Sequence, residues 1–349
     1  MPGAPSVPFS AAAQAQGGGA GPQVTYQYGA EFVTIPALNN APFFRPELGN
    51  TPGNGAGTIT QEFRIGRYEV TNAQWAAFFD AVAHVRLTGQ SVPHVQNPTF
   101  ANFTVAGGHI VSQAGREMSP VGGITWRTAA MYCNWLHNDQ AVTQAAFMSG
   151  AYDVSTFGYV QGNHFTDQLT HTPGARFWIP TMNEVMASQH YDPNRYGPGQ
   201  GGYWEYNITQ DTRPTYGAPG TMVNGSVAQA NSSWLGPGDT PGAPWSTPLG
   251  SYWDVAQSPW GLLDTAGGAG EWLETAIDAG GGNRVRLFHG SAAADGALQR
   301  DRIYLYPSDL PSATGFNYGL RIAAQAVPSP SSGAVLATTG VAIFARRRR

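Results

Sequence analysis

The chain has 349 residues, of which 42% are hydrophobic and 12% aromatic, so it is long enough to bury a core in one large or two ordinary domains. Its net charge is −4, and without four C-terminal arginines it is about −8, which excludes the clustered positive charge that nucleic-acid binding requires. A single cysteine, Cys133, excludes an intrachain disulfide, and 45 glycines with 26 prolines predict a loop-rich fold. We therefore expect no nucleic-acid partner.

Residues 1–25 are interpreted as the remnant of an export signal followed by a flexible spacer. Ala13 and Ala15 offer a small-residue cleavage site, but no basic segment and no long apolar segment precede them. We therefore expect the true start of the gene product to lie upstream of Met1.

Three helices are predicted, each beginning after a threonine cap. Thr71 and Gln74 have the spacing of a capping box. Apolar residues then follow at i, i+3, i+4 and i+7, namely Trp75, Phe78, Phe79 and Val82. A second helix over 125–138 places Cys133 on its apolar face, and a third begins after Thr181 and ends by residue 193.

Five short strands are predicted between turn residues. They cover 31–35, 62–65, 176–179, 285–288 and 318–323. Helices and strands do not alternate as in a parallel α/β sheet, so the pattern favours an α+β fold.

Several blocks of the chain, in order, carry a family resemblance. They are Phe-Val-Thr-Ile-Pro at 32–36, Glu-Val-Thr-Asn-Ala-Gln-Trp at 69–75, Pro-Val-Gly-Gly-Ile-Thr-Trp at 120–126, Ile-Pro-Thr-Met-Asn-Glu at 179–184, Gly-Leu-Leu-Asp at 261–264 with Gly-Glu-Trp at 270–272, and Gly-Leu-Arg-Ile at 319–322. Together they resemble the formylglycine-generating enzyme, or sulfatase-modifying factor, domain family. The resemblance implies one domain over 26–325 with a coil-rich, C-type-lectin-like α+β fold, few helices and short, mostly antiparallel strands.

The catalytic cysteines of that family have no counterpart here. Aerobic formylglycine-generating enzymes use a cysteine pair near the end of the domain to hold copper(I), which soft thiolates select, and they oxidise a sulfatase cysteine. The matching stretch, 287–304, contains no cysteine, and Cys133 is expected to pack as a small hydrophobe. We therefore expect no catalytic residue of this kind and no copper. The alternative is a cysteine oxidase of the same type that uses noncysteine metal ligands.

The eight histidines show no H-x-x-x-H or H-x-H spacing, so no pair is placed on one face by local sequence. His289 stands where the family usually has an arginine before its Gly-Gly-Ser. With Ser291 and Arg300 it is predicted to border a ligand cleft. The alternative for His289 is a satisfied core or surface histidine.

The family resemblance also implies a calcium site. Glu271 matches a ligand carboxylate of the family, Asn231 falls near the other ligand segment, and Gly268 and Ala269 would offer backbone oxygens. Calcium takes six to eight oxygen ligands, so the replacement of the family's asparagine by Gly268 removes one side-chain oxygen. The alternative is that Glu271 only braces a loop through hydrogen bonds.

Paired carboxylates could instead support glycoside hydrolysis. The candidates are Asp264, Glu271 and Glu274, but nothing in their spacing singles them out.

The C-terminal segment, 326–349, has three parts. Val327, Pro328, Ser329 and Pro330 precede a 13-residue apolar run at 333–345, and Arg346, Arg347, Arg348 and Arg349 close the chain. This order resembles a PEP-CTERM sorting signal of Gram-negative bacteria and implies an exosortase-type protease as a partner. The run is shorter than the roughly 20 residues that span a membrane, and the arginines favour a cytoplasmic end, so we expect a marginal anchor.

The sequence therefore predicts an exported protein of the cell envelope or extracellular space, tethered through its C-terminus before processing. We expect a noncatalytic binding or structural module with an extracellular glycan or peptide as its ligand. Aromatic residues of the coil are candidate stacking surfaces: Tyr203, Trp204, Trp234, Trp245, Tyr252, Trp253 and Trp260.

Overall fold

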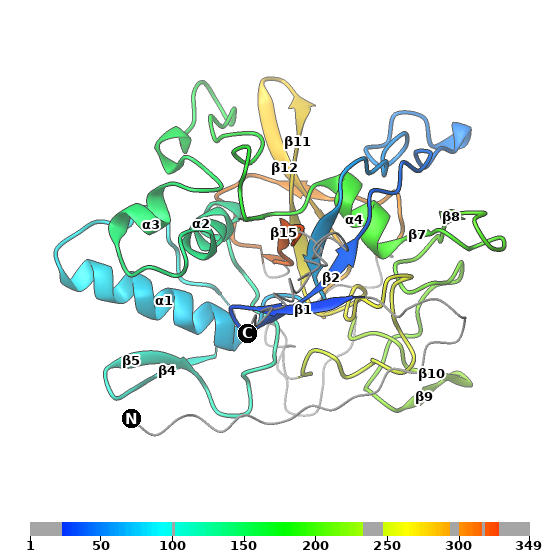
Figure 1. The fold of residues 1–349 in the computed structure, drawn as a ribbon, viewed down its shortest axis with the longest axis horizontal. Coiled ribbons are helices and arrows are strands. Elements are labelled where there is room, and N and C mark those ends of the chain that lie inside the picture. The colour runs from blue at the N-terminus through cyan, green and yellow to red at the C-terminus, as the bar shows by residue number, and fades with distance from the viewer. Residues whose placement is uncertain (1–22, 100–101, 233–246, 294–299, 316–317, 328–349) are drawn as a thin grey trace, which may run out of the picture.

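The computed structural model describes residues 23–99, 102–232, 247–293, 300–315 and 318–327. These residues form a coil-rich α+β fold in which short strands outnumber helices (Figure 1). The helices are α1 (Asn72–Leu87), α2 (Trp126–His137), α3 (Gln144–Met148) and α4 (Met182–Gln189), with 3-10 turns at Pro46–Leu48 and Val154–Thr156.

One sheet is antiparallel throughout and has the strand order β1-β2-β3-β15-β6. Its strands are β1 (Val24–Gln27), β2 (Ala30–Ile35), β3 (Phe63–Gly66), β15 (Ala323–Gln325) and β6 (Phe177–Trp178). Ile65 of β3 pairs with Val33 of β2 on one side and with Ala323 of β15 on the other. The last described strand, β15, therefore lies in the same sheet as the first strands.

The second sheet has the order β13-β12-β11-β14, with β14 parallel to β11. Its strands are β11 (Gly270–Gly280), β12 (Asn283–His289), β13 (Ser308–Asp309) and β14 (Tyr318–Gly319). The β11–β12 hairpin projects beyond the rest of the domain (Figure 1). Three further hairpins are β4 (Phe103–Ala106) with β5 (His109–Ser112), β7 (Tyr191–Asp192) with β8 (Gly202–Tyr203), and β9 (Met222–Val223) with β10 (Ser226–Val227).

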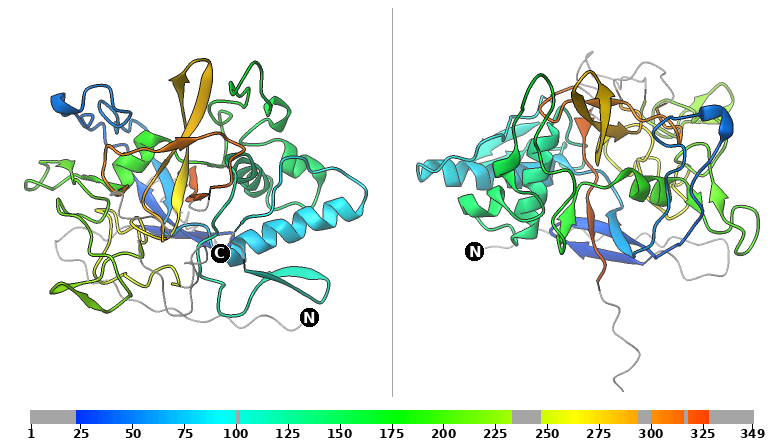
Figure 2. Two further views of the ribbon diagram at one scale, coloured as in Figure 1. Left: turned by 180° about the vertical axis from the view of Figure 1, so that it is seen from behind. Right: turned by 90° about the horizontal axis from the view of Figure 1, so that it is seen from above.

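Aromatic packing joins α1 to α2. The ring of Trp75 lies 5.0 Å from that of Tyr132, and Phe78 lies 5.8 Å from Trp135. All four side chains are buried. Helices α1 to α3 gather on one side of the sheets, and the coil carrying β7 to β10 lies on the other (Figures 1 and 2).

The three predicted helices are confirmed with their threonine caps, and complete capping boxes form at Thr71 and Thr181. The predicted strands are found in place, except that 318–323 divides into β14 and β15, which belong to different sheets. The helix α3 and the longest strand, β11, were not predicted. The antiparallel, coil-rich fold class is confirmed.

Several sequence predictions fall on segments outside the described residues. These are the signal region up to residue 22 and the sorting segment from Pro328 to Arg349, of which only the exposed Val327 is described. Within the described ranges, no helix has the length and apolar character needed to cross a bilayer.

Candidate functional site

A buried polar centre, formed by Glu69, Asp264, Glu271 and Arg321, lies where the two sheets meet. Arg321 lies between β14 and β15 and is fully buried. Its Nε donates to Glu271 Oε1 at 2.7 Å. Its other guanidinium nitrogens donate to the carbonyl oxygens of Gly66, Arg67 and Leu263. One arginine therefore neutralises Glu271 and joins two backbone segments, at 66–67 and at 263.

Glu69 lies against the loop that leads into β11. Its carboxylate accepts the Ala269 N–H at 3.1 Å. Burial, followed by the charge of Glu271, raises the pKa of Glu69 well above its usual value despite the nearby Arg321. Gly268 has a φ of +65°, and a Cβ there would clash with the Glu69 carboxylate. The glycine at this position is thus required by both backbone conformation and space.

The structure brings three of the four predicted calcium ligands together: Asn231 contacts Gly268, and Ala269 is the next residue. Gly268 N–H donates to the Asn231 carbonyl at 3.2 Å, and the Gly268 carbonyl accepts from Ala293 N–H at 2.9 Å. The fourth, Glu271, accepts from Arg321 through Oε1 and from Gln189 through Oε2 at 2.7 Å. A calcium ion bound through the Asn231 and Gly268 carbonyls or the Glu271 carboxylate would have to share oxygens that already accept protein hydrogen bonds. The calcium site stays a prediction.

His289 at the end of β12 faces His190, which ends α4. Both side chains are fully buried, and their Nε2 atoms are 3.0 Å apart. His190 Nδ1 lies 3.2 Å from the Trp204 carbonyl, and His289 Nδ1 lies 3.3 Å from the Leu305 carbonyl. A neutral imidazole carries one N–H group, so the two rings have two N–H donors. The three contacts, between the two Nε2 atoms and from each Nδ1 to its carbonyl, need three donors, so one contact has no proton. A cation held by both Nε2 atoms would let both Nδ1–H groups donate to their carbonyls.

Burial sets the charge of this histidine pair. Burial lowers the pKa of His289 to about 4. Burial, with the adjacent His289, lowers the pKa of His190 well below its usual value. Both imidazoles are therefore neutral at pH 7, which is the form that binds metal ions.

Ser291 is hydrogen-bonded to Asp301, a residue that no motif of the sequence indicated. Asp301 accepts from Ser291 N–H at 2.7 Å and from its hydroxyl at 2.8 Å. It also accepts from the Tyr216 hydroxyl at 2.7 Å. Ser291 and His289 are closed off from solvent, while the Arg300 guanidinium lies 5.6 Å from the Phe288 ring. The predicted ligand cleft at these residues stays a prediction.

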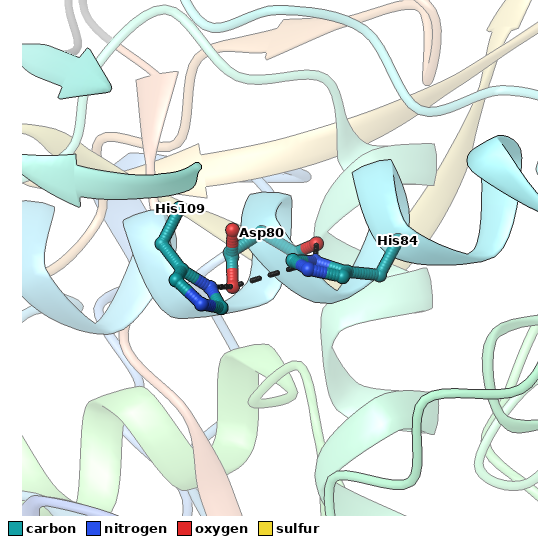
Figure 3. Close-up of side chains that lie close together, drawn as sticks. All are labelled: Asp80, His84 and His109. Carbon is teal, nitrogen blue, oxygen red and sulfur yellow. Dashed lines mark hydrogen bonds and ion pairs between the residues drawn. The ribbon is translucent and has the colours of Figure 1, made fainter. Parts of the chain in front are cut away.

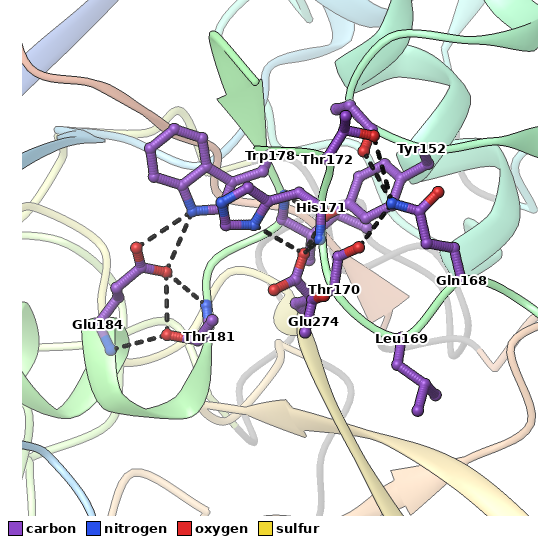
Figure 4. A network of polar contacts seen from close by, with 12 residues as sticks. Tyr152, Gln168, Leu169, Thr170, His171, Thr172, Trp178, Thr181, Glu184 and Glu274 are labelled. Atoms are coloured by element: carbon purple, nitrogen blue, oxygen red, sulfur yellow. Dashed lines mark hydrogen bonds and ion pairs between the residues drawn. The ribbon is translucent and has the colours of Figure 1, made fainter. Parts of the chain in front are cut away.

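Glu274 belongs to a separate buried network (Figure 4). Its Oε1 accepts from the Tyr152 hydroxyl at 2.8 Å and from His171 Nδ1 at 2.9 Å. The His171 ring stacks on Trp178 at 4.6 Å. Burial lowers the pKa of His171, but the bond to Glu274 and its charge outweigh burial and raise it. The Glu274 carboxylate therefore joins Tyr152 and His171 within the core of the fold.

The other two carboxylates considered for hydrolysis are also bonded internally. Asp264 accepts the Gly250 N–H at 2.6 Å, and burial raises its pKa to about 6. Glu271 pairs with Arg321. These bonds support bracing roles for Asp264 and Glu271.

The thiol of Cys133 is buried on α2. Its exposed fraction is 0%, and burial, with the charge of Glu274, raises its pKa well above the usual value. The thiol thus stays protonated at neutral pH, and a protonated, enclosed thiol is a poor nucleophile and a poor metal ligand.

A surface cavity of about 350 Å³ lies between the β7–β8 hairpin and the coil before β3. Its lining residues are Ala41, Pro42, Phe43, Phe44, Arg45, Tyr191, Arg195, Tyr196, Gly201, Gly202 and Tyr203. Phe44 and Tyr196 are 66% and 65% exposed, and Arg195 lies against Tyr196 with its guanidinium 5.1 Å from the ring centroid. We call this the aromatic cavity.

The aromatic residues predicted to stack on ligands are in different settings. Tyr203 lines the aromatic cavity, Trp253 is 55% exposed elsewhere, and Tyr252 is buried. Trp234 and Trp245 lie outside the described residues.

Comparisons with known proteins agree with this fold. A model of the sulfatase-modifying factor enzyme 1-like domain matches residues 45–326. The crystal structure of CarF is 18% identical with a TM-score of 0.51, covering 85% of this chain and 98% of CarF. Variable protein 1 of Treponema denticola is 16% identical with a TM-score of 0.50, covering 87% of this chain and 99% of that protein.

PvdO from Pseudomonas aeruginosa is also similar in structure, at 15% identity and a TM-score of 0.45, covering 88% of this chain and all of PvdO. A search of curated protein sequences found no match. At these identities CarF and variable protein 1 show a shared fold only. The family model matches most of the chain, and the chain therefore belongs to the family of sulfatase-modifying factor enzyme 1-like domains.

Proposed function

We propose that the chain is an exported, noncatalytic member of this family that serves as a binding or structural module, tethered through residues 326–349. One observation carries the noncatalytic part. The sequence contains one cysteine, and its thiol is enclosed by the α2 core. A copper(I) centre built on a cysteine pair therefore cannot form within one chain.

The aromatic cavity supports the binding part of the proposal. Exposed rings such as Phe44 and Tyr196 offer flat apolar faces, and the Arg45 side chain, 37% exposed and paired with Glu205, supplies a guanidinium at the same cavity. Aromatic faces beside polar donors suit sugar rings, which have apolar faces and many hydroxyl groups. We therefore propose an extracellular glycan as the ligand, with a peptide as the other outcome of the test.

An immobilised array of bacterial envelope glycans, probed with the full chain, tests this proposal. Binding should be lost in Tyr196→Ala and Phe44→Ala. It should persist in Trp253→Ala, which removes an exposed ring of another region. Equal binding by all three variants would remove the cavity from the account, and retention of peptides alone would change the ligand class.

The tethering part rests on the sequence of the C-terminal segment. Both the full chain and a chain ending at Val327 would be produced behind a complete export signal in a bacterium that contains an exosortase. Fractionation should find the full chain with the envelope and the shortened chain in the medium. Identical distributions of both chains would contradict tethering.

A second candidate function has one observation in its favour, the His190–His289 pair. Paired neutral imidazoles with carbonyl partners behind them could hold a copper or iron ion without cysteine. This is the oxidase alternative with noncysteine ligands, and bound copper or iron is its first requirement.

A further inference from the structure

Three potential metal ligands converge on the surface between α1 and the β4–β5 hairpin. They are Asp80 and His84, one turn apart on α1, and His109, the first residue of β5. One ligand atom from each lies within 4.8 Å of the others. Figure 3 shows Asp80 between the two histidines.

The carboxylate is held in place by the hairpin. Asp80 Oδ1 accepts the Ile110 N–H at 2.8 Å, which leaves Oδ2 directed at His109 Nδ1, 2.9 Å away. His84 Nδ1 lies 3.6 Å from the same Oδ2. Burial alone would raise the pKa of Asp80, but the hydrogen bonds from His109 and Ile110 outweigh it and lower it. The carboxylate is therefore ionised at neutral pH.

The two imidazoles face each other beside this carboxylate. Their ring centroids are 5.1 Å apart and their planes differ by 25°. The side chains of His84 and His109 are 38% and 60% exposed, so a hydrated ion can reach them and a water molecule can complete its coordination.

We propose that Asp80, His84 and His109 form a binding site for a divalent first-row transition metal, with zinc as its ion. Imidazole and carboxylate are suitable zinc ligands, with bonds of about 2.0–2.2 Å and a tetrahedral shape that places ligand atoms roughly 3.3 Å apart. Asp80 Oδ2 lies 2.9 Å from His109 Nδ1 and 3.6 Å from His84 Nδ1, both near this value. His84 Nδ1 also lies 2.8 Å from the Asp80 backbone carbonyl, a contact that the ion would replace. The ion would replace the proton shared by His109 and Asp80 and would join α1 to the β4–β5 hairpin.

Calorimetric titration of zinc chloride into the full chain, purified without a metal-affinity tag and freed of chelator, tests the site. We expect one zinc per chain at this site and about a tenfold or larger loss of affinity in His109→Ala and in Asp80→Asn. His109 is mostly exposed, and asparagine keeps an oxygen for the Ile110 N–H, so both variants should fold.

The matched control is His164→Ala, which removes a histidine elsewhere on the domain that lines a different surface cavity. It should leave zinc affinity unchanged, and zinc should shift the ring resonances of His84 and His109 in the NMR spectrum. No zinc binding, or equal affinity in the wild type, His109→Ala and Asp80→Asn, would overturn the proposal.

Discussion

At the residue scale, the buried histidine pair makes stability depend on pH. The pKa of His289 falls from 6.5 in the unfolded chain to about 4 in the fold, because burial opposes the charged ring. On acidification the unfolded chain therefore binds this proton first. The free energy of unfolding contributed by this pKa difference, roughly 3 kcal/mol, is fully present above pH 6.5. It is lost progressively as the pH falls from 6.5 through 4.

The variant His289→Gln should remove the contribution of His289 and leave that of His190, whose pKa burial also lowers, because glutamine can still bond to His190 without titrating. Urea unfolding of both proteins at intervals from pH 7.5 to 4 measures the slopes. A flatter curve for the variant is expected. Parallel curves would show that His289 protonates equally in the folded and unfolded chains.

At the scale of elements, Arg321 joins the two sheets through Glu271 on β11 and the carbonyls of Gly66 and Arg67 at the end of β3. Arg321→Met removes the positive charge that neutralises Glu271, leaving that carboxylate only its Gln189 donor, and removes the Arg321 donors from these carbonyls. We expect a loss of unfolding free energy of about 3–5 kcal/mol in urea denaturation.

Two further variants serve as comparisons for the stability loss in Arg321→Met. The double variant Arg321→Met with Glu271→Met should recover part of the loss, because it removes the uncompensated charge. Arg176→Met breaks an exposed ion pair with Asp139 and should lower the free energy of unfolding much less, because solvent screens that pair. A loss in Arg321→Met as small as that in Arg176→Met would contradict a joining role for Arg321.

The elements that the sequence predicted are those with local signals. Thr71 and Thr181 begin helices because each caps its own first turn. The strand β11 was missed because its residues 270–274 are buried in succession, without the alternation that marks a half-exposed strand. The split between β14 and β15 depends on partners distant in sequence, β11 for one and β3 with β6 for the other.

The candidate sites, like the strands, could be predicted only where the signal lies within a short segment of the sequence. The segment containing Gly268 and Glu271 was located by its motif, with Asn231 near the other ligand segment. The pairing of Glu271 with Arg321, however, links residues 50 positions apart. His190 meets His289 across 99 positions, and His109 meets Asp80 across 29. Spacing rules for one helix or strand cannot detect such pairs, because chain topology brings them together.

At the scale of the whole molecule, the family's scaffold is present while its cysteine pair is absent. The buried polar groups of the fold, Glu69, Glu271, Glu274 and Asp301, bond to other parts of the chain. Such bonds hold long coil segments that have little regular secondary structure to stabilise them. This arrangement supports a rigid platform that offers surfaces, such as the aromatic cavity, to a ligand.

The most direct test of the noncatalytic proposal is aldehyde formation on a peptide that carries a sulfatase-type cysteine. The full chain, supplied with copper(I) and dioxygen, would be compared by mass spectrometry with an aerobic formylglycine-generating enzyme under the same conditions. We predict no aldehyde above the level of the peptide without protein. Aldehyde that forms with this chain and disappears in His190→Ala and His289→Ala would contradict the account and establish an oxidase with histidine ligands.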